Sequence, residues 1–500
     1  MAGIALKRPL TVLIIGAGAS GLAAAELLGQ FPCFNILILE ADNRLGGRCK
    51  TQPVDTVDGC YDLGASFIHG SESNPVYEMA RKHNIDIIKS STDWNSIRYC
   101  TENGQALNKA TLGEVTNFYH ECIDRSKQFA HAADNSALPK GISTVGAFVR
   151  NCLSQRILEL DEKEKSTFAS IFKCYELLEC LNSGCDSLFD LQLKDFGQYQ
   201  ELDGYHWEFK NGYNDFIQLL FNNLNKTNTT IQLNSVVECV DYSSIDQDNC
   251  KQLISETSDE HPINVRCTNG KIYPADHVIC TIPLGVLKQM AETLFNPTLP
   301  KSKLEAIYRL GFGTVNKVYL FYNKPFWGDD PFRTIFIWND NQYKYPNNET
   351  YPLPESEAWL KKVFAISSSD HCNNALVFWM VGSAAEEIEN VIDTQVSNSL
   401  TKLLNFYIKD PHIELPYKIV KSNWHNNPYS RGSYSYVSSI STGEDFQLIE
   451  DPLLSKQRNS PLIMFAGEAT HKQFYSTVHG AYLTGRREAL RLLQTYGLKS

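Results

Sequence analysis

Short apolar runs near the N-terminus alternate with a small-residue segment in the order strand, helix, strand. Residues 10–15 and 35–39 are apolar runs, and residues 20–28 carry small and apolar residues at helical spacing. Continuous apolar runs of this length are typical of strands that are buried on both faces of a parallel sheet. The first forty residues therefore predict a βαβ unit.

Similar patterns return far along the chain. Later strands are predicted at residues 231–233, 236–240, 277–282, 314–322, 363–382 and 462–466. Helical spacing of apolar residues predicts a mostly helical stretch at residues 108–190 and a helix at residues 479–493. Asn, Tyr and Pro over residues 339–354 indicate a surface loop. A sheet assembled from such distant pieces predicts a discontinuous domain with a second domain threaded through it.

Composition limits the class of protein. The chain has 500 residues, 43% of them hydrophobic and 21% charged, which is typical of a globular protein with two or three domains. Its 46 basic and 57 acidic residues give a net charge of −11, which argues against a nucleic-acid partner. No apolar window is long enough for a membrane span. We expect a cytosolic protein and leave a peroxisomal or nuclear pool open.

The cysteines indicate neither a disulfide framework nor a metal site. There are fourteen, spread along the chain, and none forms a C-x-x-C pair. In a chain of this length they are interpreted as reduced, mostly buried thiols. No bound metal is predicted.

A dinucleotide fingerprint joins the first strand to the first helix. Gly16, Gly18, Ser20 and Gly21 form the turn, and Glu40 ends the next strand nineteen residues later. The three glycines permit a tight turn, close approach of the backbone to a pyrophosphate and close helix–strand packing. The helix N-terminus would receive the pyrophosphate, and the glutamate would accept ribose hydroxyls.

The segment after the fingerprint resembles a known signature. Glu40-Ala-Asp-Asn-Arg-Leu-Gly-Gly-Arg48 is similar to the E-A-x-x-R-x-G-G-R string of the flavin amine oxidase superfamily. Further matches lie at residues 64–70, 281–285, 428–436 and 465–480. Within the superfamily, the combination of Ile68-His-Gly70, Arg431-Gly-Ser-Tyr-Ser-Tyr and Glu468-Ala-Thr-His looks like the animal polyamine oxidases, N1-acetylpolyamine oxidase and spermine oxidase.

The resemblance implies an α/β flavoprotein with two domains. A discontinuous Rossmann-like FAD-binding domain would comprise residues 1–90, 208–296 and 420–500. An interleaved α+β substrate-binding domain would comprise residues 91–207 and 297–419. The FAD would be noncovalent, because Ser433 stands where monoamine oxidases carry the tethering cysteine.

The implied reaction is the oxidation of a secondary amine of a polyamine to an imine, which water splits into a shorter amine and an aldehyde. Oxygen would be reduced to hydrogen peroxide. The partners expected are the polyamine and O2, and the protein would be a monomer or a weak homo-oligomer.

The resemblance also assigns site residues. The predicted FAD contacts are Gly16, Gly18, Ser20, Gly21, Glu40, Arg48, Gly64, Ala65, Val237, Trp424, Glu468, Thr477 and Val478. Lys317 and His69 are the predicted catalytic residues. Lys317 interrupts an apolar strand face, and the superfamily places a lysine there that holds a water near flavin N5. His69 would face the substrate tunnel.

Substrate contacts are predicted at His69, Asn182, Tyr434, Ser476 and Thr477. Tyr434 matches the flavin-facing aromatic of the superfamily, but Thr477 replaces the second aromatic of monoamine oxidases. Spermine oxidases carry a carboxylate and a hydroxyl where Asn182 and Gly184 stand here, so an N1-acetylated spermine or spermidine is the predicted substrate. Glu179, one helical turn earlier, keeps free spermine open as the alternative. A catalytically silent FAD-binding scaffold is the alternative from another class, which an intact Lys317 disfavours.

Overall fold

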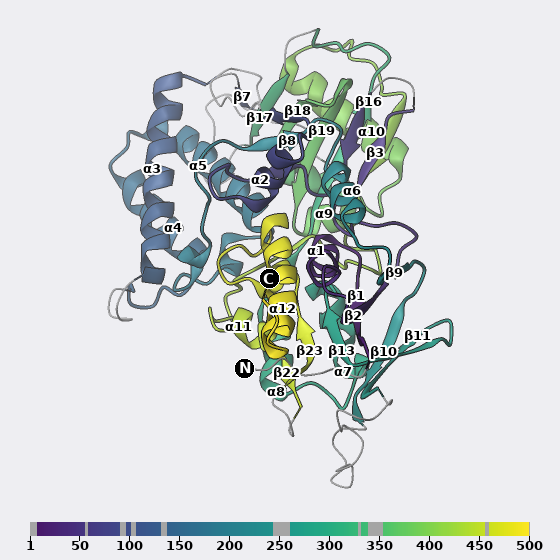
Figure 1. Ribbon diagram of the computed structural model, residues 1–500. Helices are drawn as coiled ribbons and strands as arrows, with labels where there is room; N and C mark the ends of the chain where they lie inside the picture. Colours follow the sequence, from purple (N-terminus) through teal and green to yellow (C-terminus); the bar gives the residue numbers. More distant parts are fainter. Residues whose placement is uncertain are drawn as a thin grey trace.

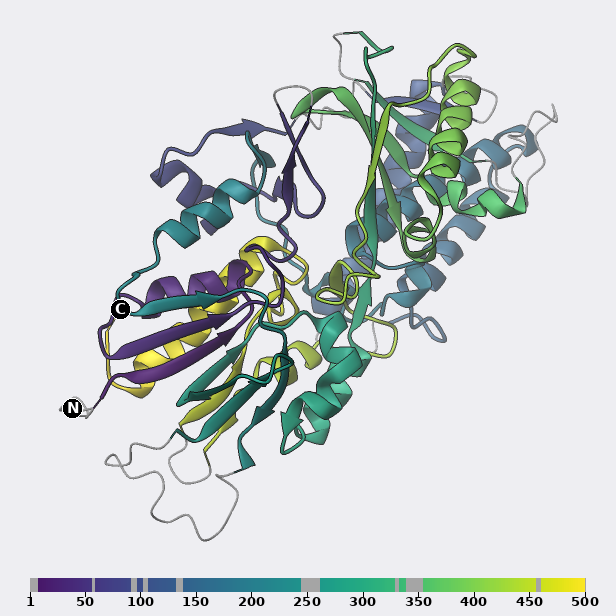
Figure 2. The same ribbon diagram turned by 90° about the vertical axis from the view of Figure 1, so that its right-hand side faces the viewer.

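The computed structural model describes residues 8–55, 59–90, 97–101, 107–131, 138–243, 261–328, 332–338, 354–455 and 460–499. The loop predicted over residues 339–354 lies outside these ranges, apart from Pro354. Figure 2 shows two lobes, and the first strand and the last helix lie in the same lobe.

A six-stranded sheet forms the centre of this first lobe (Figure 1). Its order is β22-β23-β13-β1-β2-β9, and all neighbours pair in parallel except β22 and β23. The strands are β1 (Leu10–Ile15), β2 (Phe34–Leu39), β9 (Thr229–Gln232), β13 (His277–Cys280), β22 (Leu453–Leu454) and β23 (Pro461–Phe465). The predicted βαβ unit and the predicted later strands of this sheet are confirmed to within two residues.

Both faces of this sheet are buried, as its continuous apolar runs require. Val12 and Ile14 of β1 pack against helices on one face, whereas Leu13 and Ile15 pack against a second sheet on the other. The helices on the first face are α1 (Ala19–Leu28), α2 (Pro75–Lys82), α6 (Asn214–Asn222) and α12 (Val478–Thr495). Figure 1 shows α1 and α12 side by side, although they come from opposite ends of the chain.

The second sheet has four strands in the order β12-β11-β10-β14. They are β10 (Val237–Asp241), β11 (Ile263–Cys267), β12 (Ile272–Ala275) and β14 (Phe295–Asn296). Helices α7 (Leu284–Leu294), α8 (Lys301–Arg309) and α11 (Asp445–Glu450) complete the core between this sheet and the first. This arrangement confirms the Rossmann-like prediction for the first lobe.

Another six-stranded sheet forms the second lobe, in the order β20-β16-β19-β18-β17-β7. Its strands are β7 (Arg98–Thr101), β16 (Val315–Phe321), β17 (Arg333–Ile337), β18 (Ala365–Ser369), β19 (Cys372–Val381) and β20 (Lys418–Lys421). The strands predicted at residues 314–322 and 363–382 are confirmed, and a turn at Asp370 and His371 divides the latter into β18 and β19. All neighbours pair antiparallel except β17 and β7.

Helices cover both faces of this sheet. The predicted helical stretch at residues 108–190 contains α3 (Lys109–Gln128), α4 (Val145–Leu158) and α5 (Glu162–Ser183), which pack on one face with Val315. Helices α9 (Ser383–Ile388) and α10 (Asp393–Ile408) pack on the other face with Val318. The boundaries that we assign to the two domains stay a prediction.

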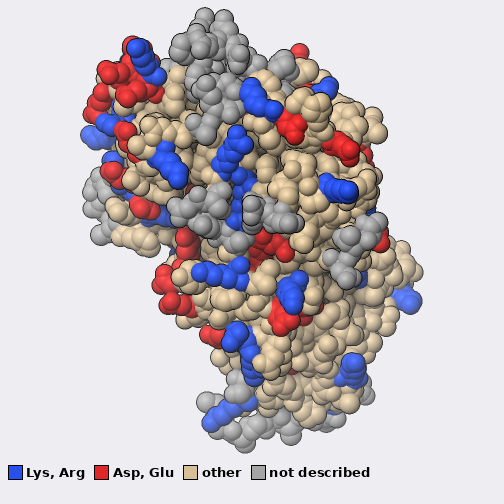
Figure 3. All heavy atoms as spheres, turned by 90° about the horizontal axis from the view of Figure 1, so that it is seen from above, with Lys and Arg blue, Asp and Glu red and all other residues tan. Residues whose placement is uncertain are grey.

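The described residues also form three small sheets. They are formed by β3 (Thr51–Pro53) with β4 (Cys60–Asp62), by β5 (Phe67–Ile68) with β8 (Trp207–Phe209) and β6 (Ile87–Lys89), and by β15 (Gly311–Gly313) with β21 (Tyr434–Tyr436). Seen from above, the described Lys and Arg side chains lie interspersed with Asp and Glu (Figure 3). Among the described residues, no helix is long and apolar enough to cross a membrane.

Candidate active site

The predicted site residues surround one cavity of about 940 Å³. The lining includes every predicted contact except Gly21, although these residues come from distant parts of the chain. Gly21 lies behind the turn, where a Cβ atom would be 2.0 Å from the carbonyl oxygen of Gly16. Its part in the fingerprint is therefore the close packing of helix on strand.

The first glycine turn presents open backbone to the cavity. Gly16 has φ +106°, which favours glycine, and a Cβ atom on Gly18 would have only the oxygen of Gly46 nearby, at 3.9 Å. Gly18 precedes α1 as its N-cap, and no described side chain caps the helix. The free N–H groups of the first turn, with the positive end of the helix dipole, suit an anionic ligand. Ser20 lines the cavity in the same turn.

Glu40 is buried at the end of β2. Its Oε2 accepts a hydrogen bond from the Ala17 amide at 2.7 Å, and its Oε1 accepts one from the Asp42 amide at 2.8 Å. Burial raises the pKa of Glu40, and these two amides oppose that rise. Since each carboxylate oxygen can accept a further bond, Glu40 can bind hydroxyl groups in the cavity.

Arg48 and Glu468, predicted separately, form one charged pair. Arg48 Nη1 donates to Glu468 Oε1 at 2.8 Å and to the carbonyl oxygen of Ser433 at 2.8 Å. Glu468 Oε2 accepts from Ser435 Oγ at 2.5 Å and from the Ser476 amide at 2.8 Å. The pair joins the second glycine turn to two later motifs, a link that sequence reasoning missed because the charges lie 420 residues apart.

The C-terminal helix also begins at the cavity. Thr477 is its N-cap, and its Oγ1 accepts a hydrogen bond from the Gly480 amide at 3.0 Å. Ser476 has φ +67°, and its hydroxyl donates to the carbonyl oxygen of Ser435. Thr477 and Ser476 therefore shape the local backbone as well as line the cavity with Val478.

Trp424 and Gly64 both line the cavity. Trp424 is buried, and its Nε1 donates to the carbonyl oxygen of Leu63 at 2.9 Å. A Cβ atom on Gly64 would lie 1.8 Å from the oxygen of Arg48 and 3.0 Å from the Trp424 ring. Glycine is thus required there, and Ala65 and Val237 line the adjoining space.

Lys317 lies in β16 with only 3% of its surface exposed. Its Nζ donates to the carbonyl oxygens of Asp62 at 2.9 Å and Gly64 at 2.8 Å, and to Ser66 Oγ. It also lies 4.4 Å from the centre of the Trp379 ring. Burial lowers the pKa of Lys317 to about 8, against the opposing effect of nearby carboxylates. The predicted placement on an otherwise apolar strand face is confirmed.

A buried ion pair that acts on Lys317 was missed from the sequence. Glu208 of β8 and His371 of the β18–β19 turn lie 2.9 Å apart, between Oε2 and Nε2, and both line the cavity. Burial opposes a charge on His371, but the bond to Glu208 raises its pKa above the usual range. The Glu208 charge in turn acts on Lys317. Neither Glu208 nor His371 lies in a recognisable sequence motif. Their proximity is therefore seen only in the folded structure.

His69 projects into the cavity after β5. Its ring lies 5.3 Å from the ring of His206 and 6.0 Å from that of Phe67. His69 is exposed to the cavity, and the protein atoms around its ring, together with His206, lower the pKa of His69 to about 4, while Glu201 acts in the opposite direction. The imidazole is therefore neutral at physiological pH and has one donor and one acceptor nitrogen to offer a ligand.

Tyr434 is held by its own hydroxyl, which donates to the carbonyl oxygen of Leu181 at 2.5 Å. Gly184 ends α5 with φ +76°, and a Cβ atom there would meet the Tyr434 ring at 2.6 Å. Gly184 thus makes room for the ring. Ser433 Oγ donates to the carbonyl oxygen of Val315 at 2.8 Å and accepts from the Val315 amide at 2.9 Å.

The end of α5 contributes the polar part of the substrate wall. Glu179 and Asn182 both line the cavity, and burial raises the pKa of Glu179. Two charged residues that sequence reasoning missed, Lys127 and Glu201, line the same region. Lys127 Nζ lies 3.0 Å from Glu201 Oε1.

Comparison with known proteins agrees with this arrangement. The family described as flavin containing amine oxidoreductase matches residues 19–493. The chain belongs to this family. Two relatives are named peroxisomal N(1)-acetyl-spermine/spermidine oxidase. The one from Bos taurus is 32% identical over 96% of this chain and 94% of its own, and the one from Homo sapiens is 32% identical over 97% and 95%. An Arabidopsis thaliana relative named probable polyamine oxidase 5 is 26% identical over 97% and 98%.

As a flavin containing amine oxidoreductase, the chain uses FAD, and the resemblance to the animal polyamine oxidases is confirmed. The lining fits this cofactor. The uncapped start of α1 suits the pyrophosphate, buried Glu40 suits a ribose, and the start of α12 suits the partial negative charge of a flavin ring. Within the described residues, no cluster of three or more metal-ligating side chains occurs.

Proposed function

We propose that this amine oxidoreductase acts on polyamines, with N1-acetylated spermine or spermidine as its substrate. A secondary amine loses two electrons and two protons to become an imine, O2 takes them up as hydrogen peroxide, and water splits the imine into an amine and an aldehyde. The observation that carries the proposal is the single cavity that joins the dinucleotide turn, buried Lys317 and the polar end of α5. The names of the relatives support the substrate class.

FAD, when bound, supplies the two-electron acceptor that this reaction requires. Glu40 binds a ribose of the cofactor, and the start of α1 binds its phosphates. Lys317 Nζ donates to Asp62, Gly64 and Ser66, and it would hold a water near the flavin by exchanging the bond to Ser66 Oγ for one to the water.

The other lining residues act on the amine. Neutral His69 accepts a hydrogen bond from an amine nitrogen, and the Tyr434 ring restricts how the amine approaches. Asn182 offers an uncharged amide to an acetylated end. An unpaired ammonium in a partly dry tunnel would require an anionic partner, which Asn182 does not supply. Free spermine is the alternative because Glu179 also lines the cavity.

The test is a peroxide assay of the purified flavoprotein with N1-acetylspermine, N1-acetylspermidine, spermine, spermidine and a monoamine. We expect peroxide with the polyamines and the highest kcat/KM with an acetylated one. A preference for spermine would contradict the acetyl assignment alone. Turnover of the monoamine without turnover of any polyamine would contradict the proposed substrate class.

Two further predictions accompany this function. We propose a cytosolic protein, although the two oxidases from cow and human are named peroxisomal, and imaging of the tagged chain in cells would check this. We also propose a monomer or a weak homo-oligomer, which light scattering across a concentration series would check.

A further inference from the structure

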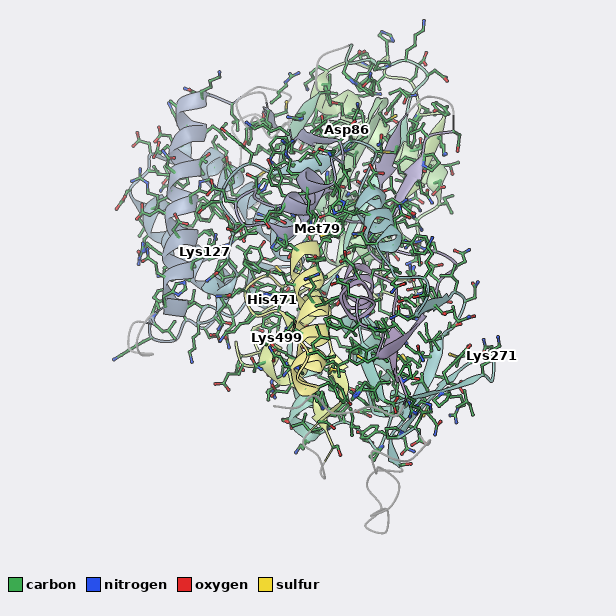
Figure 4. All side chains as sticks on the ribbon, viewed as in Figure 1. Met79, Asp86, Lys127, Lys271, His471 and Lys499 are labelled. Carbon is green, nitrogen blue, oxygen red and sulfur yellow. The ribbon has the colours of Figure 1, made fainter. Side chains whose placement is uncertain are left out.

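Five polar residues form a cluster in the cavity wall at the end of α5. Glu179, Asn182 and Ser183 come from the last turns of α5, Lys127 comes from the last turn of α3, and Glu201 follows in the chain. Figure 4 labels Lys127 beside α3. All five line the cavity, and we call them the α5-end cluster.

Lys127 compensates one of two carboxylates in this cluster. Its Nζ donates to Glu201 Oε1 at 3.0 Å. Burial opposes the charge on Lys127, but Glu201 and Glu179 raise its pKa above the usual range, so it stays an ammonium. Burial raises the pKa of the Glu179 carboxyl, whereas the positive charge of Lys127 lowers it. With both carboxylates ionised, the charge of the cluster is −1 with Lys127 and −2 without it.

The ion pair of Lys127 and Glu201 lies where the cavity meets solvent. The side chains of Lys127 and Glu201 are 37% and 72% exposed, whereas Glu179 lies deeper. A substrate with a charged end must compete with an ammonium that is already in place. A substrate with a neutral end meets no such competition.

We propose that Lys127 is a specificity-determining residue, whose ammonium group occupies the position of a substrate's terminal ammonium and so selects polyamines with a neutral, amide-capped end. This inference rests on the polyamine oxidase function proposed above and identifies the end group that the site accepts. Asn182 lines the same region and offers an amide that pairs with a substrate amide through both its donor and its acceptor.

The charge of Lys127 gives the size of the effect. Two like charges several ångströms apart at an effective dielectric constant of about 20 repel strongly enough to change a binding constant by about tenfold or more. Free spermine carries one more positive charge than N1-acetylspermine. Removing the lysine charge should therefore raise the ratio of kcat/KM for spermine to kcat/KM for N1-acetylspermine by about tenfold.

The experiment measures this ratio in the flavin-loaded wild type and in four flavin-loaded variants. Lys127→Gln should raise it about tenfold, and Glu201→Gln should lower it, because the charge of the cluster becomes 0. The double variant restores a charge of −1 and should return the ratio to near the wild-type value. Lys127→Arg should keep the wild-type ratio.

Lys165→Gln is the matched control. Lys165 also pairs with a carboxylate, Glu162, at 2.6 Å, but it lies near the start of α5, about 20 Å from Glu179 along the helix. The Lys165→Gln substitution should leave the kcat/KM ratio unchanged. An unchanged ratio in an active Lys127→Gln enzyme, or an equal change in Lys165→Gln, overturns this inference alone. Absence of turnover of both substrates by the flavin-loaded wild type overturns the proposed function and this inference together.

Discussion

The guanidinium of Arg48 binds the carboxylate of Glu468, with 2.8 Å between Nη1 and Oε1. Arg48 follows the second glycine turn, Glu468 follows β23, and the same Nη1 also binds the backbone of Ser433. Three segments that were each matched to the family by their own motif therefore meet through one side chain. This contact positions the Glu468 region against the segment that follows the second glycine turn.

Loss of the Glu468 charge should destabilise the protein. The Glu468 carboxylate accepts hydrogen bonds from Arg48, Ser435 and Ser476. In Glu468→Gln the NH2 group of the new side chain would face one or more of these donors, and a hydrogen bond would be lost. We expect a loss of about 2 kcal/mol in the free energy of unfolding, measured by urea denaturation of the flavin-free protein. Glu305→Gln is the control, because Glu305 pairs with Arg309 at 3.5 Å on the surface and should cost little. Small and equal losses of unfolding free energy in both variants would show that the Arg48–Glu468 pair does not stabilise the protein.

The FAD should leave the protein on denaturation. Ser433 has no thiol to tether the flavin, and its hydroxyl is occupied by the backbone of Val315. Cys49 does line the cavity, but burial together with Asp62 raises its pKa to about 12, so it stays a poorly nucleophilic thiol. After acid or heat precipitation we expect the flavin absorbance in the supernatant. Flavin that remains in the pellet after washing would indicate a covalent bond.

Short-range chemistry could be predicted from the sequence, and long-range pairing could not. The turn from Gly16 to Glu40 is a continuous string whose glycines and acid each have a local physical reason, and the structure places it as expected. Lys317 was found because a charge interrupted an apolar strand face. Such signals lie within one element and need no partner.

The charged partners carry no comparable signal. His371 lies in a turn between two strands, and Glu208 lies 163 residues away. Lys127 is one of two lysines in α3, and Glu201 follows 74 residues later. Gly184 was interpreted as a missing hydroxyl, but its positive φ and the Tyr434 ring already exclude a larger residue. The roles assigned to the individual site residues stay predictions that the following experiments address.

Lys317 should be needed for turnover and not only for stability. Lys303 offers a matched control: it is equally buried, its Nζ binds the carbonyl oxygens of residues 448, 449 and 451, and it lies 4.4 Å from the Phe465 ring. Burial lowers the pKa of Lys303, like that of Lys317, to about 8. It does not line the described part of the cavity.

We expect Lys317→Met and Lys303→Met to lose stability to a similar extent, because each leaves buried carbonyl oxygens without a donor. Only Lys317→Met should also slow flavin reduction or reoxidation, by about a hundredfold, in stopped-flow experiments. Similar half-reaction rates in both variants would make Lys317 a structural lysine.

The rate of flavin reduction should rise between about pH 6 and pH 9. The reacting nitrogen must have a free lone pair, and free amines with a pKa near 10 are mostly protonated at neutral pH. Lys317 titrates in the same range, with a pKa of about 8, and loses its positive charge above it. In Lys317→Met the rise due to the amine should persist, and any inflection near pH 8 should disappear. If the rate of flavin reduction in the wild type does not change with pH, the reaction does not require a free amine.

Acid should destabilise the protein through its buried histidines. Burial, with a smaller effect of His69 and His471, lowers the pKa of His479 to about 3, and the described residues offer its Nε2 no hydrogen-bond partner. An unfolded histidine has a pKa near 6.5. As the pH falls from 6.5 toward 4, the unfolded state therefore binds a proton that the folded state does not, and stability is lost. In His479→Asn the slope of the unfolding free energy against pH should be shallower by about 1.4 kcal/mol per pH unit.

Urea denaturation of the flavin-free protein at a series of pH values measures this slope. The control is His412→Asn, because His412 is exposed. Equal slopes in the two variants would contradict the prediction.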